Sequence, residues 1–245
     1  MSDELDIIIA GLRRTQKMLS PKYFYDDHGS KLFEEITQLP EYYLTNTELD
    51  IMAGNIDEMA AEIGERASLI EFGSGSSMKT RMLLAHMHSP AAYVPVDISE
   101  EHLHESQLSI QADFPEIEVL PVVADVMQPF DLPSPRTMPL RNVVYFPGST
   151  IGNFELDDAI NLLRLMHAEA GTDGALLIGV DLQKDPGIVN TAYNDSAGVT
   201  ARFNVNILRH LNRAFGSDFN LDAFAHRATY RPNEGRVVVE LVSRA

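Results

Sequence analysis

The chain has 245 residues, 44% of them hydrophobic, and a formal net charge of −17 at pH 7. This length is enough for one large or two modest domains with a buried core. The negative charge argues against nucleic acid or an anionic membrane surface as a partner, because binding to either needs clustered lysine and arginine. The absence of cysteine excludes disulfides and thiol catalysis.

The N-terminal region is expected to be helical and to precede the main sheet. Residues 2–19 show a helical spacing of apolar side chains, and Ser20-Pro21 ends the pattern. The sequence contains no apolar run of about 18 residues and begins with an acidic segment, so neither a membrane span nor a signal peptide is expected. A cytoplasmic location is therefore predicted.

Tyrosines are dense between residues 22 and 45, where Tyr23, Tyr25, Tyr42 and Tyr43 occur. Aromatic side chains at this density are typical either of a flap over a ligand site or of a short helix packed on a sheet. Composition alone does not separate these two interpretations. Residues 46–65 then show the apolar spacing of a helix that leads into the first strand.

Residues 68–80 predict a strand, a glycine turn and a helix, which together form the first unit of a nucleotide-binding sheet. Glycine permits positive φ and lets a ligand lie against bare backbone. The third glycine of the dinucleotide fingerprint is replaced here by Met78. Glu71, just before the glycines, suits a cationic or hydroxyl-rich ligand better than phosphate. The alternative interpretation is a tight turn without a ligand.

Four more strands are predicted at residues 92–97, 119–125, 142–148 and 175–181. Asp97 ends the first of these about 20 residues after the glycines, where such folds place the carboxylate that accepts ribose hydroxyls. Asp125 and Asp181 end two of the others. Acids along one sheet edge, without a basic phosphate clamp, favour S-adenosylmethionine (SAM) over NAD. The fold class predicted is α/β with a Rossmann-like sheet.

The histidines do not predict a metal site. His86 and His88 lie two residues apart, so they point to different faces of a predicted helix. His102 and His104 repeat this spacing in an acidic helix. Solvated side chains are the interpretation that fits both pairs, and no metal is expected.

Five ordered blocks closely resemble the SAM-dependent histidine-specific methyltransferases, and the resemblance runs from about residue 20 to 245. The blocks are Tyr23–Thr45, Glu71–Thr80, Tyr93–Ser99, Phe146–Phe154 and Tyr193–Asn206. This resemblance implies a class I SAM methyltransferase sheet over residues 48–182. It also implies a smaller, discontinuous α+β substrate-binding domain formed by residues 1–47 and 183–245. The implied activity is methylation of the α-amine of histidine, as in ergothioneine biosynthesis, with a small amino acid as the binding partner.

The resemblance also implies roles for individual residues. It assigns SAM binding to Tyr25, Gly73, Lys79, Asp97, Asp125 and Gly148. Substrate binding falls to Tyr42, Asn153 and Tyr193, and the last two are the candidates for a catalytic role. Their amide and hydroxyl groups can fix an α-carboxylate and an amine. The alternative for Asn153 is a structural cap on a helix that starts near Leu156.

Two departures from the family's pattern affect these expectations. Members of the family extend beyond the equivalent of Ala245, so the sheet is expected to end at its fifth strand with an uncovered edge through which the chain self-associates. Val239, assigned to substrate binding, stands where a methionine is expected, and a wider pocket would accept another aromatic amino acid, such as a tryptophan derivative. A truncated SAM-binding protein with little activity is the other alternative.

The segment 228–243 allows two placements. Its two apolar stretches, separated by a Pro-Asn-Glu-Gly turn, predict a β-hairpin. The pattern alone favours adding this hairpin to the cofactor sheet. The resemblance instead places it in the substrate-binding domain, which is the placement predicted here.

Overall fold

The computed structural model describes residues 2–74 and 78–244. Contacts divide the chain into two compact units, a larger one formed by Leu44–Asp181 and a smaller one formed by Met1–Tyr43 and Leu182–Ala245. This division alone does not assign a ligand to either unit, so the predicted roles of the two domains stay predictions.

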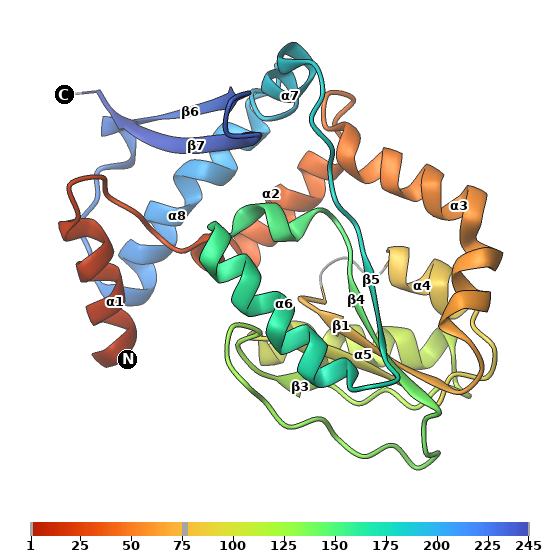
Figure 1. Cartoon of the computed structure of the whole chain (residues 1–245). Coiled ribbons are helices and arrows are strands. Elements are labelled where there is room, and N and C mark those ends of the chain that lie inside the picture. The colour runs from red at the N-terminus through yellow and green to blue at the C-terminus, as the bar shows by residue number, and fades with distance from the viewer. Residues whose placement is uncertain (1, 75–77, 245) are drawn as a thin grey trace. The chain divides into compact units, whose positions relative to one another are not determined.

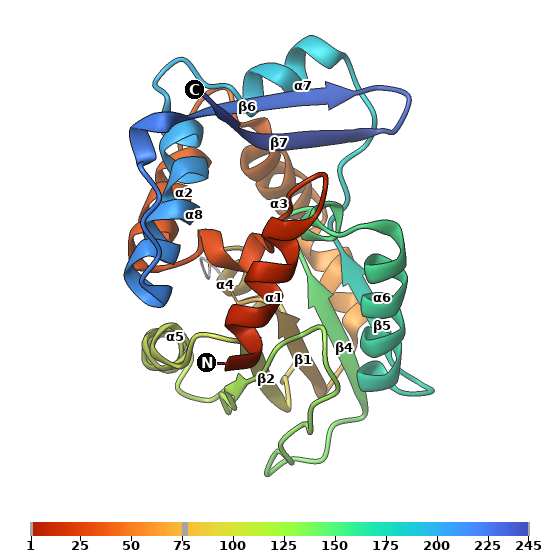
Figure 2. The same cartoon turned by 90° about the vertical axis from the view of Figure 1, so that its left-hand side faces the viewer.

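The larger unit contains a five-stranded parallel sheet with strand order β3-β2-β1-β4-β5, which confirms the predicted α/β fold (Figure 1). The strands are β1 (Ala67–Phe72), β2 (Ala92–Asp97), β3 (Val122–Val123), β4 (Arg141–Phe146) and β5 (Ala175–Ile178). From β1 the chain adds β2 and β3 on one side, and it then returns to add β4 and β5 on the other side of β1, so the strand order switches between β1 and β4. Such a switch point is where open α/β sheets bind ligands, outside the carboxyl ends of the strands. The common direction of β1 and β4 can be followed in Figure 2.

Helices cover both faces of this sheet. One face packs against α3 (Tyr43–Ile63), α4 (Met78–Leu84) and α5 (Glu100–Asp113), and the other against α6 (Leu156–Ala170). Successive side chains of a strand point to opposite faces, so Leu69 enters the first core and Ile70 the second. Because both faces are buried, these strands read as nearly continuous apolar runs rather than as alternating patterns.

The third strand is shorter than the predicted 119–125. Tyr93 forms an isolated parallel bridge with Val119, and the ladder resumes only at Val122. On β2, Tyr93 bonds this segment through both its N–H and its carbonyl, and the next residue that faces β3 is Pro95, which has no N–H to donate, so the ladder is interrupted there. Asp125 therefore follows β3 across a short connection rather than ending the strand itself.

The smaller unit is built around α8 (Val199–Phe215). Ile207, Leu208 and Leu211 of this helix form a core with Ile8 and Tyr23. The other elements are α1 (Ser2–Arg13), η1 (Pro21–Phe24), α2 (Asp27–Thr37), α7 (Pro186–Ala192), η3 (Leu221–Ala223), β6 (Phe224–Arg231) and β7 (Arg236–Ser243). The antiparallel strands β6 and β7 form a sheet of their own, so the hairpin does not extend the five-stranded sheet.

Helix α1 ends at Arg13 rather than at residue 19. The chain folds back on the last turn, where Met18 N donates to Gly11 O at 3.2 Å and Lys17 Nζ to Leu12 O at 2.8 Å. These bonds satisfy carbonyl groups that the end of a helix leaves open. No helix within residues 2–74 and 78–244 is long and apolar enough to span a lipid bilayer.

Asp26 joins α2 to α8 within the smaller unit. Its carboxylate caps α2 by accepting from Gly29 N at 2.8 Å, and it also accepts from Asn206 Nδ2 at 2.7 Å and Arg213 Nη2 at 2.9 Å. Burial acts to raise the pKa of Asp26, but the hydrogen bonds from Gly29 and Asn206 outweigh it and hold the pKa below its usual value. A charged carboxylate is therefore part of the packing of these helices.

Candidate active site

The carboxyl end of β1 presents bare backbone at Gly73. This residue has φ +75°, is exposed, and donates its N–H to Val96 O at 2.8 Å. Among residues 2–74 and 78–244, no heavy atom lies within 4 Å of the position that a Cβ would take. The described part of the chain therefore leaves the Gly73 backbone open, and its predicted role in ligand binding stays a prediction. Gly75, the second glycine of the predicted turn, lies outside the described residues.

Two of the predicted acids follow adjacent strands at the same edge. Asp97 Oδ1 accepts from Ser99 N at 3.0 Å, and Asp125 Oδ1 accepts from Met127 N at 2.9 Å. Both are side-chain turns in which the carboxylate bonds the backbone two residues ahead. The two acids are partly exposed, and Ala124 N donates to Asp97 O at 3.0 Å, which ties the loops together. The structure thus brings Asp97 and Asp125 to neighbouring strand ends.

Lys79 and Gly148, which the sequence also assigned to the cofactor, share one partner. The carboxylate of Glu48, on α3, pairs with Lys79 Nζ at 2.6 Å and accepts from Gly148 N at 2.8 and 3.0 Å. The side chains of Lys79 and Glu48 are only 16% and 18% exposed. A Cβ on Gly179 would lie in contact with the Glu48 carboxylate, so only glycine leaves room for this arrangement.

Glu48 was missed by the sequence analysis. It lies in the predicted helix 46–65 as one acid among several, and nothing in its local pattern separates it from a solvated side chain. The available signal was indirect: Gly148 and Gly179 follow adjacent strands, and glycines at two neighbouring strand ends indicate the close approach of another group. Glu48 links α3 and the start of α4 to the end of β4.

Glu71 occupies a different environment from the one its position suggested. Its side chain is buried, and it accepts hydrogen bonds from Thr80 Oγ1 at 2.9 Å and from the Tyr93 hydroxyl. A direct contact with a cationic ligand is therefore not what the structure describes. Burial raises the pKa of Glu71 to about 7, although the bonds from Tyr93 and Thr80 oppose the rise. Through these two hydrogen bonds, Glu71 connects the start of α4 to β2.

The predicted substrate residues of the smaller unit lie in and beside an aromatic cluster. The rings of Tyr42 and Tyr193 meet edge to face with centroids 6.1 Å apart, and Tyr42 meets Phe33 at 6.3 Å. Tyr25 contacts Phe33 at 5.6 Å. The cluster comprises Phe24, Tyr25, Phe33, Tyr42, Tyr193 and Phe203. Tyr42 is buried and Tyr25 is 45% exposed, so the cluster is closed at one end and open at the other.

Val239 and Asn153 complete the predicted substrate set. Val239 pairs with Ala228 across the β6–β7 hairpin and is 41% exposed. Asn153 is exposed and ends a short 3-10 helix, η2 (Thr150–Asn153). The residue before α6 is Glu155, so Asn153 is not the cap of that helix. Asn153 belongs to the larger unit, whereas Tyr42, Tyr193 and Val239 belong to the smaller one.

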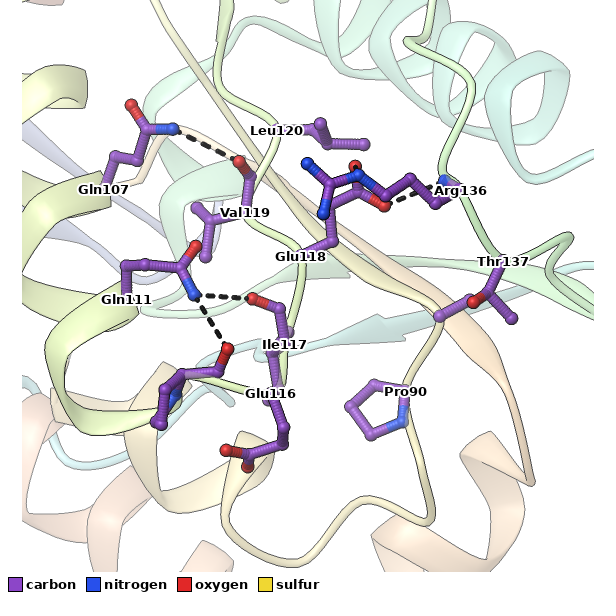
Figure 3. Close-up of a pocket in the computed structure, with 12 residues that line it drawn as sticks. Pro90, Gln107, Gln111, Glu116, Ile117, Glu118, Val119, Leu120, Arg136 and Thr137 are labelled. Carbon is purple, nitrogen blue, oxygen red and sulfur yellow. Dashed lines mark hydrogen bonds and ion pairs between the residues drawn. The ribbon is translucent and has the colours of Figure 1, made fainter.

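A cavity at the opposite edge of the sheet offers little for a ligand (Figure 3). Its lining includes Pro90, which precedes β2, and Thr137, which precedes β4, so it lies at the amino ends of the strands. Gln111 Nε2 donates to backbone carbonyls, including Ile117 O at 3.0 Å, and the Glu118 carboxylate accepts from Arg136 N at 2.8 Å. These polar groups hold the loops together, and the cavity is not the predicted site.

The carboxyl edge fits SAM by the chemistry of its groups. Gly73 supplies open backbone, Asp97 and Asp125 supply carboxylates for hydroxyl and amine donors, and Lys79 supplies one cation for a carboxylate. The fold and this edge define the class: an α/β protein of the Rossmann-like type with its ligand edge at the β1–β4 switch point.

Comparison with known proteins gives the family. Residues 3–245 match the family described as histidine-specific methyltransferase, SAM-dependent, and the chain belongs to it. The chain is 40% identical to histidine N-alpha-methyltransferase of Mycolicibacterium smegmatis over 96% of its own length and 73% of that protein. It is 38% identical to the Mycobacterium tuberculosis protein of the same name over 94% of its own length and 71% of that protein. Ergothioneine biosynthesis protein 1 of Neurospora crassa is 31% identical, over 91% of this chain and 27% of that protein.

The raised pKa of Glu71 predicts a pH-dependent stability. The folded protein holds this proton more tightly than the unfolded chain, so the contribution is complete below the ordinary pKa of 4.5 and is lost as pH rises through about 7. Between these limits the free energy of unfolding should fall by up to about 3 kcal/mol from this group. Urea denaturation from pH 4.5 to 8 should show that fall in the wild type relative to Glu71→Gln, with Glu105→Gln, an exposed site, as the control. A constant difference between wild type and Glu71→Gln across that range would contradict the assignment.

The position of Glu48 predicts a structural cost on its removal. Glu48→Ala leaves the ammonium of Lys79 and the amide of Gly148 without their shared acceptor, so the free energy of unfolding should fall by about 2 kcal/mol, since the pair is largely but not fully buried. Glu58→Ala, an exposed position on the same helix, should change it by less than about 0.5 kcal/mol. Urea denaturation of both variants measures the difference, and equal effects would show that the Glu48 pair contributes nothing.

Proposed function

We propose that this chain transfers a methyl group from SAM to the α-amine of histidine. The observation that carries the proposal is a carboxylate-lined ligand edge in a chain that belongs to the histidine-specific, SAM-dependent methyltransferase family. The two mycobacterial relatives named as histidine N-alpha-methyltransferases support the same substrate and the same amine. The relative named as an ergothioneine biosynthesis protein supports that pathway.

The donor is proposed to lie at the carboxyl edge of the larger unit. Asp97 would accept hydrogen bonds from the ribose hydroxyls, and Asp125 would lie beside the adenine. Gly73 and Gly148 would provide backbone for close approach, and Lys79 would pair with the donor's carboxylate. An ammonium has three N–H donors, so the pairing of Lys79 with Glu48 is compatible with this role. The assignment of Tyr25 to the donor rests on the resemblance alone.

The amino acid is proposed to contact Tyr42, Tyr193 and Asn153. The amide of Asn153 and the hydroxyl of Tyr193 can both donate and accept, which suits an α-carboxylate and a neutral α-amine. Bound SAM supplies an electrophilic methyl on a sulfonium, so the protein needs neither a nucleophile nor a metal of its own. The task of these residues is to orient the amine lone pair and to exclude water.

A second substrate class follows from the hairpin. Val239 lies opposite Ala228, and both side chains are small. If Val239 contacts the substrate, this part of the smaller unit leaves space for an aromatic amino acid larger than histidine, such as a tryptophan derivative. A cytoplasmic location is a further proposal, and it rests on the cysteine-free sequence, which suits a reducing compartment. Self-association through the β5 edge of the sheet is another, and it rests on the position of β5 at the end of the strand order.

Calorimetry and mass spectrometry test the function together. The chain should bind S-adenosylhomocysteine (SAH) and histidine, and incubation with SAM and histidine should yield product heavier by one or more methyl groups. Tyr193→Phe and Asn153→Ala should each lower kcat/KM for histidine by about tenfold or more, because each removes a hydrogen bond to a charged or reacting group. Tyr230→Phe and Asn161→Ala are the matched controls.

The outcomes separate the alternatives. Methylation of a tryptophan derivative but not of histidine would favour the wider pocket. Binding of SAH without binding of any amino acid would identify a SAM-binding protein and overturn the proposed reaction. Unchanged kinetics in Tyr193→Phe and Asn153→Ala would remove those two residues from the substrate assignment while leaving the reaction in place.

A further inference from the structure

The backbone carbonyl of Tyr193 is held by a partly buried relay of two side chains, His226 and Asn204, within the smaller unit. Tyr193 O lies 2.9 Å from Nε2 of His226, on β6. The other ring nitrogen, Nδ1, lies 2.9 Å from Nδ2 of Asn204, on α8. Asn204 is almost fully buried, at 3% exposed, and its Nδ2 also donates to Glu240 O, on β7, at 2.9 Å. The relay therefore joins α8, β7 and β6 to the residue at the end of α7.

The carbonyl of Glu240, at one end of the relay, fixes which group donates in each hydrogen bond. Glu240 O is a backbone carbonyl and only accepts, so the Asn204 amide must turn its NH₂ group toward it. The second hydrogen of that NH₂ group then points at His226 Nδ1, which must accept. The proton of the neutral imidazole is accordingly on Nε2, where it donates to Tyr193 O. One tautomer and one ring orientation satisfy all three bonds.

The residues around Tyr193 are fixed independently. Asn190 Oδ1 accepts from Tyr230 N at 2.8 Å, and Asn194 Nδ2 donates to Ala228 O at 3.0 Å, so side chains of α7 and of the residues after it bond the free edge of β6. Helix α7 lies beside β6 in both views (Figures 1 and 2). Asp195 accepts from Val199 N at 2.8 Å at the start of α8. The N–H of Tyr193 donates to Val189 O at 3.4 Å at the end of α7, and the bond from His226 to the Tyr193 carbonyl ties this residue to β6.

We infer that His226 is a positioning residue, which sets Tyr193 for the amino-acid substrate. The inference rests on the proposed function, in which the Tyr193 hydroxyl contacts the amino acid. The ring of Tyr193 meets Tyr42 edge to face at an interplanar angle of 77°, so a rotation of the Tyr193 backbone moves both candidate substrate residues. His226 acts through Tyr193 and not on the reacting atoms.

Kinetics of four variants test this role. His226→Leu removes the donor to Tyr193 O, and KM for histidine should rise about tenfold while the Kd of SAH stays within about twofold. His226→Gln places an amide NH₂ near Nε2 and should restore KM to within about threefold of the wild type. Arg231→Ala, on the same strand, is the control, because its exposed side chain pairs with Glu234 at the hairpin turn and not with a member of the relay. The double variant of His226→Leu with Tyr193→Phe should be no worse than the poorer single variant, because both act through one side chain.

Fluorine NMR tests the positioning without turnover. In protein labelled with 3-fluorotyrosine, the resonance lost in Tyr193→Phe identifies Tyr193. His226→Leu should shift or broaden this resonance, whereas His226→Gln and Arg231→Ala should leave it in place. An unmoved resonance in His226→Leu would overturn the inference whether or not the protein is active. A moved resonance in an enzyme that methylates no amino acid would retain the positioning and refute the proposed reaction.

If KM in the double variant rose by the product of the two single-variant factors, the inference would also be overturned, because His226 would then act independently of Tyr193. Equal losses in His226→Leu and His226→Gln, with equal loss of thermal stability, would reduce His226 to a packing role.

Discussion

The parallel pairing of β1 with both β2 and β4 is the constraint on which the larger unit depends. Parallel strands place their carboxyl ends at one edge, so residues far apart in the sequence are brought together without any specific contact between them. Gly73, Asp97 and Gly148 reach that edge for this reason. Because the strand order switches between β1 and β4, the helix after β1 (α4) packs on one face of the sheet and the helix after β4 (α6) on the other. The carboxyl ends of β1 and β4 therefore lie between these two helices and are covered by neither.

Two carboxylates, Glu71 fully buried and Glu48 partly buried, hold the backbone of this edge in place. Glu71 accepts from Thr80 and Tyr93, and Glu48 accepts from Gly148 and pairs with Lys79. Neither acid needs to contact a ligand to matter, because each fixes a loop or a helix start that presents backbone at the edge. A buried carboxylate carries a desolvation penalty unless hydrogen bonds offset it. Both acids are therefore placed where several donors converge on one carboxylate.

The sequence predicted the five strands because a doubly covered parallel strand leaves a long apolar run with a sharp polar end. Asp97 ends its strand as predicted, whereas Asp125 and Asp181 follow the ends of β3 and β5 rather than ending them. It predicted β3 too long, since apolar residues 119–125 look continuous while Pro95 on the neighbouring strand lacks the N–H that the ladder needs. Glu48 and His226 were not predictable from the pattern. Their roles depend on contacts across long sequence separations, with Gly148 and Tyr193 respectively, and no local spacing encodes such a contact.

Family membership and geometry supply different parts of the account. The family gives the donor as SAM, and the two mycobacterial relatives suggest the substrate. The geometry adds physical reasons for individual residues: why Gly179 must lack a side chain, why Glu71 is buried, and why Tyr193 has a fixed carbonyl. It also separates the carboxyl edge from the cavity at the amino ends, whose polar side chains are already used within the fold.

The location of donor binding is the most direct test of this account. In a ¹⁵N-labelled sample titrated with SAH, the amide resonances of Gly73, Asp97, Asp125 and Gly148 should shift, because these residues share the carboxyl edge of the sheet. The amides of Gln107, Gln111 and Glu116, at the amino-end cavity, should stay in place. Shifts confined to that cavity, or no shifts at saturating SAH, would contradict the central claim.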